Sequence, residues 1–265
     1  CVALVAACSD NGEAQAQRHL QKAEQALKAG QYNEAKLQID SIRSQYPKAF
    51  EARKQGIGLM QQIDLAQQQR TLAYLDSMLT VQNQLVADAK EGLVLEKDTA
   101  YQDIGNYFYP TQTVEKSLGR SFLRGQVSEL GEMSLTSIYC AGGKLNHTSV
   151  KVSVGELFAE TPMSKDSYET TDLGKTIEKS DYKVGEDGGV VGFIIANQDK
   201  NIQLQFVGDK TYRTAMQKTD RKAIVELAEL ARILSGMEEI RKQQKEASLK
   251  IQFVSRKIEE GQVAK

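Results

Sequence analysis

The segment LAQQQRTLAYLDSMLTVQNQLVADAKEGL, residues 65–93, decides the fold because its apolar and small residues recur at alternating steps of three and four. This spacing keeps one seam of a helix turned toward a partner helix. A helix with such a seam needs a second helix to cover it. The seam positions are Leu65, Gln68, Leu72, Leu75, Leu79, Gln82, Val86, Ala89 and Leu93.

The covering helix is predicted near the carboxyl end, where residues 219–260 contain no proline and one glycine. The chain would run up one helix and return down the other, so the pair should be antiparallel, with Leu75 near Ile240. Helices of about thirty to forty residues would form a coiled-coil-like stalk roughly 45 to 60 Å long. The second seam comprises Leu230, Ile233, Met237, Ile240, Gln244, Ala247, Ile251, Val254 and Ile258.

Between the two seams, residues 101–216 change to period-two alternation with glycine-bearing turns, which indicates a β-rich insertion. About six to eight antiparallel strands would form a small sandwich or open barrel. Two hairpins are expected, with turns at 141–144 and 198–201. The expected strand segments are 134–140, 145–154, 170–183, 190–197 and 202–207.

Ahead of the first seam, the sequence predicts a helical hairpin. Gly30 suits the left-handed cap that ends a first helix, and Pro47 ends a second one because proline disfavours helical geometry in the residue before it. The expected organisation is α+β: an N-terminal hairpin, a long antiparallel helix pair and an inserted antiparallel β-rich domain. The expected boundaries are 1–13 for a signal-peptide remnant and tether, 14–100 for the hairpin and first long helix, 101–216 for the β-rich domain and 217–265 for the second long helix.

Seven residues give the hairpin a family resemblance: Ala23, Gly30, Tyr32, Ala35, Ile39, Ile42 and Pro47. At these spacings, residues 16–49 resemble one tetratricopeptide repeat, in which small residues let two helices approach and an aromatic fills the wedge between them. His19, Lys22 and Ala26 stand where the repeat carries large residues. One repeat cannot build the usual concave groove, so the resemblance implies the hairpin and not peptide binding. A plain helical hairpin is the alternative.

The run Leu4-Val5-Ala6-Ala7-Cys8 resembles the lipobox of bacterial lipoproteins. The resemblance implies cleavage before Cys8, acylation of Cys8 and an acidic tether over residues 9–13. Acyl chains contribute about 0.8 kcal/mol per buried methylene, so three chains would hold the protein durably. After Cys8 no uncharged apolar run is long enough to suggest a spanning helix. An apolar amino terminus with an incidental cysteine is the alternative.

Composition and motifs disfavour several functions. With 34 basic and 35 acidic residues, the chain offers no field of one sign for nucleic acid. No metal-binding or phosphate-binding motif occurs, so no metal or cofactor is expected. His19 suits an interhelical contact. Cys140 and His147 could face one another across the turn at 141–144, although a core role for Cys140 is the commoner outcome.

An aromatic cluster precedes Pro110 and offers the one candidate ligand contact. Tyr107, Phe108 and Tyr109, with Tyr101 nearby, could form an exposed platform for a glycan or a plug that packs the β-rich domain onto the helices. The plug is favoured. The expected function is a non-catalytic interaction or scaffolding lipoprotein of the bacterial cell envelope, anchored at the outer membrane and meeting an envelope protein. The alternative is a ligand- or glycan-binding lipoprotein that uses the β-rich domain.

Overall fold

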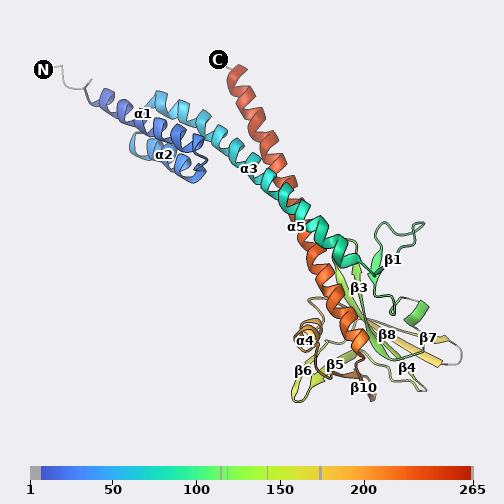
Figure 1. Ribbon diagram of the computed structural model, residues 1–265. Helices are drawn as coiled ribbons and strands as arrows, with labels where there is room; N and C mark the ends of the chain where they lie inside the picture. The colour runs from blue at the N-terminus through green and yellow to red at the C-terminus, as the bar shows by residue number, and fades with distance from the viewer. Residues whose placement is uncertain (1–6, 114, 118, 142, 173–174, 264–265) are drawn as a thin grey trace. The chain divides into compact units, whose positions relative to one another are not determined.

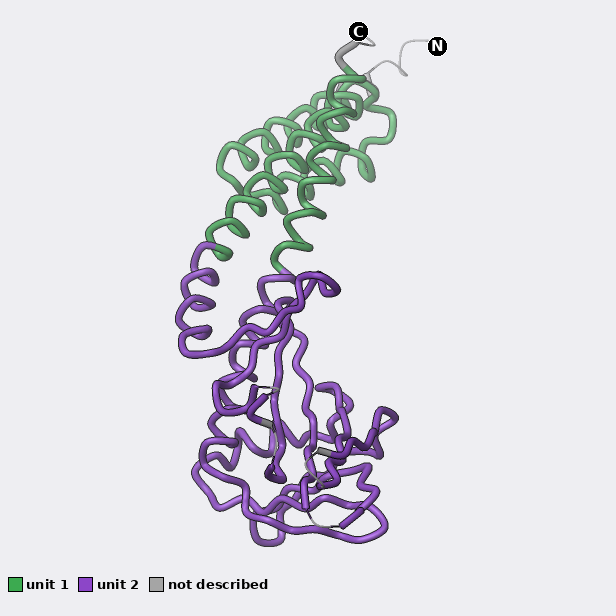
Figure 2. Tube along the Cα trace, turned by 90° about the vertical axis from the view of Figure 1, so that its right-hand side faces the viewer, with its two compact units in different colours: residues 1–79, 240–265 green, residues 80–239 purple. Residues whose placement is uncertain are grey.

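The computed structural model describes residues 7–113, 115–117, 119–141, 143–172 and 175–263, of which the side chains at 7–11, 117, 172 and 262–263 are not described. It confirms an α+β fold with N-terminal helices and a β-rich region (Figure 1). The chain divides into two compact units (Figure 2). Unit 1 consists of Cys1–Leu79 and Ile240–Lys265, and unit 2 of Thr80–Glu239.

Helices α2, α3 and α5 lie within the expected helical segments, α1 begins earlier than expected, and α4 was not expected. The two long helices each contribute residues to both units. The α-helices are α1 (Ala7–Lys28), α2 (Tyr32–Gln45), α3 (Phe50–Lys90), α4 (Val190–Ala196) and α5 (Lys218–Val263), and one 3-10 turn covers Glu115–Ser117.

The turn between α1 and α2 is set by Gly30, whose φ of 71° lies in the left-handed region. Gly30 donates its N–H to the carbonyl of Leu27, and Gln31 donates to the carbonyl of Ala26. These two bonds form the Schellman motif that satisfies the last carbonyls of a helix. At the other end of the hairpin, α2 stops at Gln45, two residues before Pro47. Both predicted helix ends are confirmed.

The hairpin packs against the first turns of α3 and forms the core of unit 1. Glu13 of α1 accepts the N–H of Ala52 at 2.8 Å, which satisfies a donor in the first turn of α3. Small residues dominate the contact and let the helices approach closely. The buried core residues are Ala16, Leu20, Ala23, Ala26, Ala35, Ile39, Ile42, Ala49, Ala52, Leu59 and Ile63.

Within unit 1, α3 and the second half of α5 run in opposite directions and contact one another (Figure 1). Gln244 of α5 donates to the Asp76 carboxylate at 2.6 Å. The sequence predicts Leu75 near Ile240; Asp76 follows Leu75, and Gln244 lies about one helical turn beyond Ile240. Leu75 and Ile240 are both buried. The antiparallel direction of the two helices is therefore confirmed, and the contact of Leu75 with Ile240 stays a prediction.

The described strands of unit 2 form a six-stranded sheet, ordered β1-β2-β3-β4-β8-β7, and a four-stranded sheet, ordered β10-β9-β5-β6. Every pairing is antiparallel. The strands are β1 (Val94–Glu96), β2 (Asn106–Phe108), β3 (Phe122–Ser128), β4 (Met133–Ala141), β5 (Ser149–Val154), β6 (Leu157–Glu160), β7 (Asp166–Asp172), β8 (Lys175–Lys183), β9 (Gln203–Val207) and β10 (Thr211–Ala215). The antiparallel pairing was predicted. The expected number of six to eight strands is too low, because the described residues form ten strands.

The predicted strand over 190–197 is wrong, because Val190–Ala196 forms α4. The carboxylate of Asp187 accepts the N–H of Val191 at 2.9 Å and so satisfies a donor at the start of the helix. Val190, Val191 and Ile194 are buried, which is the three-to-four spacing of a helix face. The β-branched residues of this segment favoured the strand prediction over the helical spacing of its apolar residues. The expected hairpin around 198–201 is wrong as well, because one of its two strands is a helix.

The predicted hairpin at 141–144 is also wrong. β4 pairs with β3 and β8 in the larger sheet, whereas β5 pairs with β6 and β9 in the smaller one. The chain therefore changes sheet between β4 and β5. Tyr139 of β4 and Phe206 of β9 lie with ring centroids 6.0 Å apart, so the two sheets pack on one another through these side chains.

The first half of α5 packs on the larger sheet inside unit 2. A Cβ on Gly125 of β3 would lie 3.0 Å from Leu227, and one on Gly131, in the turn after β3, would lie 2.3 Å from the Ser235 backbone nitrogen. Arg120 forms a two-bond ion pair with Asp220 in the first turn of α5, both at 2.7 Å. Asp220 is buried. The start of α5 is thus fixed by close backbone approach and a buried ion pair.

The lipobox lies at the edge of the described chain. Leu4, Val5 and Ala6 fall outside the described residues, and the side chain of Cys8 does too, although Cys8 belongs to α1. Residues 9–13, expected to act as a tether, lie in the same helix. Among the described residues, none of the helices combines the length and apolar character required to cross a bilayer.

Candidate functional site

Helix α3 carries apolar side chains on two faces near its start. One face is buried against the hairpin and includes Leu59 and Ile63. The other carries Phe50 and Ile57, which are 73% and 65% exposed. Phe50 and Ile57 are seven residues apart, so these two exposed apolar side chains lie on one face of α3.

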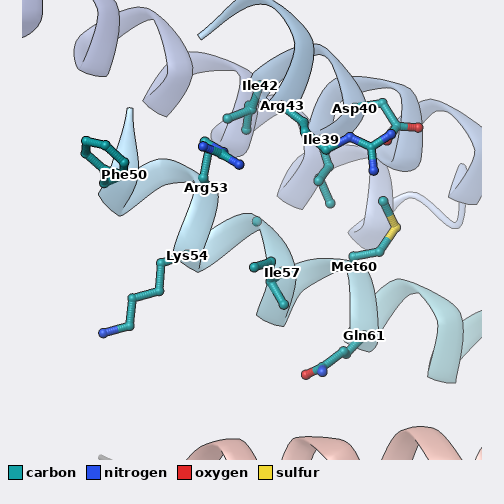
Figure 3. A pocket seen from close by; sticks show the side chains of 11 residues that line it. Ile39, Asp40, Ile42, Arg43, Phe50, Arg53, Lys54, Ile57, Met60 and Gln61 are labelled. Atoms are coloured by element: carbon teal, nitrogen blue, oxygen red, sulfur yellow. The ribbon is translucent and has the colours of Figure 1, made fainter. Parts of the chain in front are cut away.

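This second face borders a groove between α2 and α3 (Figure 3). The groove has a volume of about 510 Å³, and its lining is mostly apolar. The walls come from positions three and four apart on α2 and three, four and seven apart on α3, which is the spacing of a single helix face. The lining residues are Ile39, Asp40, Ile42, Arg43, Phe50, Arg53, Lys54, Gly56, Ile57, Met60 and Gln61.

Gly56 sets how closely the two walls approach. It is buried, and a Cβ built on it would touch Ile39 Cγ2 at 3.4 Å. Lys36 of α2 and Asp64 of α3 form an ion pair at 2.6 Å, which also links the two helices. The groove is therefore built on two helices fixed to one another, and a preformed site of this kind loses little entropy on binding.

The charges around the groove are mainly positive. Arg43, Arg53 and Lys54 contribute three cations against the single anion of Asp40. Arg53 donates to the Pro47 carbonyl at 2.8 Å, while Arg43 lies 3.9 Å from Asp40 with most of its side chain exposed. The net excess of positive charge favours ligands that carry negative charge beside an apolar surface.

The ionisable groups of the groove define the chemistry that it offers. Its ionisable groups are two arginines, one lysine and one aspartate, with no thiol, imidazole or hydroxyl nucleophile. In the described part of the chain, no three histidine, cysteine or acidic side chains gather closely enough to hold a metal ion.

The predicted aromatic contact residues occupy unit 2. Tyr107 and Phe108 lie on β2 and are only 7% and 4% exposed, while Tyr109 is half-buried. The Lys90 ammonium lies 4.8 Å from the centroid of the Tyr107 ring. Tyr101, at 89% exposed, is the solvent-facing aromatic of the group. The burial of Tyr107 and Phe108 agrees with the plug, whereas Tyr101 faces solvent.

His19 lies where the helical hairpin predicts an interhelical contact. Its Nδ1 is 2.6 Å from the Gln38 side-chain oxygen on α2, and its ring lies 5.7 Å from that of Tyr46. His19 thus connects α1 to α2.

Cys140 and His147 do not face one another, and the favoured core role of Cys140 is confirmed. Cys140 packs against Phe122, Ile138 and Ile177, so its role as a small core residue is the one observed. His147 lies on the opposite side of β4, where Nε2 is 2.7 Å from Ser137 Oγ. Because side chains alternate across a strand, residues 137 and 140 face opposite ways and cannot both meet one imidazole.

His147 belongs to a buried polar network that the sequence did not reveal. Its Nδ1 lies 3.1 Å from Glu178 Oε2, and the same carboxylate accepts the backbone N–H groups of Leu145, Asn146 and His147 at 2.6 to 2.9 Å. Glu178 therefore holds the segment before β5 against β8. No local signal links residue 178 to residues 145–147, since the contact spans more than thirty positions.

Ser137, His147 and Glu178 follow one another in the order of a catalytic triad, but their surroundings differ from those of one. They are 0%, 2% and 4% exposed, and the Ser137 hydroxyl also lies 3.3 Å from the Tyr182 hydroxyl. A nucleophile must reach a substrate, and the Ser137 hydroxyl is covered by protein on all sides. The network serves as structure in this conformation.

The charge state of the network follows from burial. Desolvation lowers the pKa of His147 below its usual value of 6.5, against an opposing effect from Glu178, so the imidazole is neutral at neutral pH. Burial raises the pKa of Glu178, but the three backbone N–H bonds outweigh it and hold that pKa below its usual value. A carboxylate paired with a neutral imidazole results.

The groove itself was not identified from the sequence, although a signal exists. Phe50 and Ile57 are seven residues apart on α3 and lie off the face that carries Leu59 and Ile63.

Comparison with protein-family models, curated proteins and solved structures gives no match. The site is therefore interpreted from its own residues.

Proposed function

We propose that this chain is a non-catalytic interaction protein of the bacterial cell envelope, held to the outer membrane by lipid on Cys8. The groove between α2 and α3 is its binding surface. The observation that carries the proposal is the open apolar lining of this groove, with Phe50 and Ile57 largely exposed. Contiguous exposed apolar surface is a common feature of protein interaction sites.

The alternative is binding of a small ligand by unit 2. The interface between its sheets is filled by side chains such as Leu204 and Phe206, which are 1% and 0% exposed. Space around the sheets remains at a pocket of about 820 Å³ that includes Gln126, Asp166 and Asp181. That pocket has polar and apolar walls in similar measure, whereas small-molecule sites are predominantly apolar. The packing of unit 2 therefore favours the interaction function.

The anchor is tested on the protein produced in its native host. Mass spectrometry of the peptide that ends at Arg18 should show Cys8 as its first residue, carrying a diacylglyceryl group and an amide-linked acyl chain. A Cys8→Ser variant should leave the membrane fraction. An unmodified thiol at position 8 would remove the anchor from the proposal.

The interaction is tested separately, by cross-linking the tethered protein in intact envelopes and recovering it under denaturing conditions. One partner in stoichiometric amount is the expected result. Recovery of no protein together with a tightly held small molecule would favour the alternative function.

A further inference from the structure

The groove has the shape that receives a helix. Both walls are helices, so their side chains form ridges with a channel between them, and a third helix fits such a channel with its own ridge of side chains. The lining of α3 extends from Phe50 to Gln61, a length of about 17 Å at 1.5 Å per residue. That length matches about three turns of a bound helix.

The depth of the groove argues against a flat partner surface. Ile42 lines it and is only 1% exposed, whereas Phe50 and Ile57 stand out at 73% and 65%. A flat lipid surface could touch the two exposed residues but could not follow the walls inward. A ridge of side chains from a helix can do both.

The charges specify the helix further. Arg43, Arg53 and Lys54 flank the apolar lining, and Asp40 is the one acidic residue there. Like charges brought together at an interface are unfavourable, and opposite charges favour association. A helix with glutamate or aspartate beside its apolar stripe complements this rim.

We propose that the groove binds an acidic amphipathic helix of a partner protein, with apolar residues at steps of three, four and seven and carboxylates on the flanks. This inference rests on the proposed interaction function and names the chemistry of the partner. It does not depend on the lipid anchor, because the groove lies wholly within unit 1 and is formed by α2 and α3 alone.

The test uses two synthetic helical peptides with the same leucine stripe, one flanked by glutamate and the other by lysine. Binding to the full chain, carrying Cys8→Ser for solubility, is measured by fluorescence anisotropy. The acidic peptide should bind about tenfold more tightly or better, and the difference should shrink at high salt because ions screen exposed charges. Equal binding of the two peptides, or binding of neither, would overturn the inference.

Variants locate the site. Ile57→Glu should abolish binding of the acidic peptide, and Arg43→Glu combined with Arg53→Glu should transfer the preference to the basic peptide. The matched control is Leu249→Glu on α5, a residue that is 56% exposed and does not line the groove; it should leave binding unchanged. Circular dichroism verifies that each variant is folded. Binding that survives Ile57→Glu in a folded protein contradicts the assignment.

Two other occupants are separate outcomes. If the Cys8→Ser chain sediments with phosphatidylglycerol vesicles and Ile57→Glu prevents this, the groove is a lipid-binding surface and the inference fails. If the chain forms a dimer that Ile57→Glu dissociates, the occupant is a second copy and the inference fails again. A native Cys8 without lipid would refute the anchor but would leave the peptide result intact, so the two proposals fail separately.

Discussion

The α2–α3 groove of unit 1 and the buried polar network of unit 2 differ in which side chains they cover. Unit 1 exposes large apolar residues along the α2–α3 groove, while unit 2 buries polar residues such as Ser137, His147 and Glu178. Exposed apolar groups serve binding, and buried polar groups with full sets of partners serve the fold. The residues that resemble a catalytic triad stabilise unit 2, and we propose that the apolar residues of the unit 1 groove serve binding.

The strongest test of this contrast removes the carboxylate at the centre of the buried network. Glu178→Ala leaves the N–H groups of Leu145, Asn146 and His147 without their acceptor. Two of these donors, on Leu145 and His147, are buried, and the Asn146 N–H is partly buried. The expected loss of stability is about 3 kcal/mol or more, because each buried unsatisfied donor costs about 1 to 3 kcal/mol. Chemical denaturation of unit 2, followed by tyrosine fluorescence, measures the loss. A change below about 1 kcal/mol would mean that the network is dispensable.

The helix pair of unit 1 is expected to respond less strongly. Leu75 is 3% exposed at the seam between α3 and α5, and Leu75→Ala should cost about 2 to 3 kcal/mol through lost burial and the cavity left behind. The matched control is Leu85→Ala on the same helix, since Leu85 is 40% exposed. Helical circular dichroism during urea titration reports both variants. Equal costs for the two would contradict the predicted seam.

Acid should weaken unit 2 through the same network. The folded state holds the pKa of His147 below 6.5, so the unfolded chain binds a proton first as pH falls through that value. Stability is then lost with falling pH, by at most about 1.4 kcal/mol per pH unit for one proton. The lowered pKa of Glu178 acts in the same direction at still lower pH. Melting temperatures from pH 8 to pH 5 measure the slope, which His147→Gln should flatten.

A substitution at Gly56 is expected to raise the stability of unit 1, by less than the substitutions above lower stability. Alanine favours a helix interior by about 0.8 to 1 kcal/mol relative to glycine, and the added Cβ would make an ordinary contact with Ile39 at 3.4 Å. Gly56→Ala should therefore stabilise unit 1 slightly. Urea midpoints of the two proteins test this, and a clear destabilisation would show that α2 and α3 approach more tightly than described.

Ile57→Ser should have the smallest effect on stability, because a residue 65% exposed contributes little to the core. A change within about 0.5 kcal/mol is expected, as for other surface substitutions. Loss of partner binding without loss of stability would sharpen the contrast between the units, whereas unfolding on this substitution would mean that Ile57 serves the fold.

Local rules made the helical part of the fold predictable. Gly30 and Pro47 mark helix ends by backbone geometry alone, and the seams repeat over many turns. The β-rich part was harder, because sheet pairing joins distant residues: the partner of the 145–147 backbone is Glu178. The segment that begins at Val190 combines strand-forming residues with helical spacing. In the structure the carboxylate of Asp187 accepts the N–H of Val191 and so stabilises the start of a helix.

The groove was missed for a related reason. A sequence shows that Phe50 and Ile57 share a helix face, but not that no other helix covers that face. Burial of Tyr107 and Phe108 was anticipated because a junction between helices and strands must bury apolar surface.

The most direct test of the account places a photoreactive amino acid at position 57 in one protein and at position 249 in another, and irradiates intact native envelopes. The account predicts that position 57 captures one partner protein, that the acidic peptide competes this capture away, and that position 249 captures none of it. Equal capture at both positions, or capture at position 57 that the peptide leaves unchanged, would contradict the account.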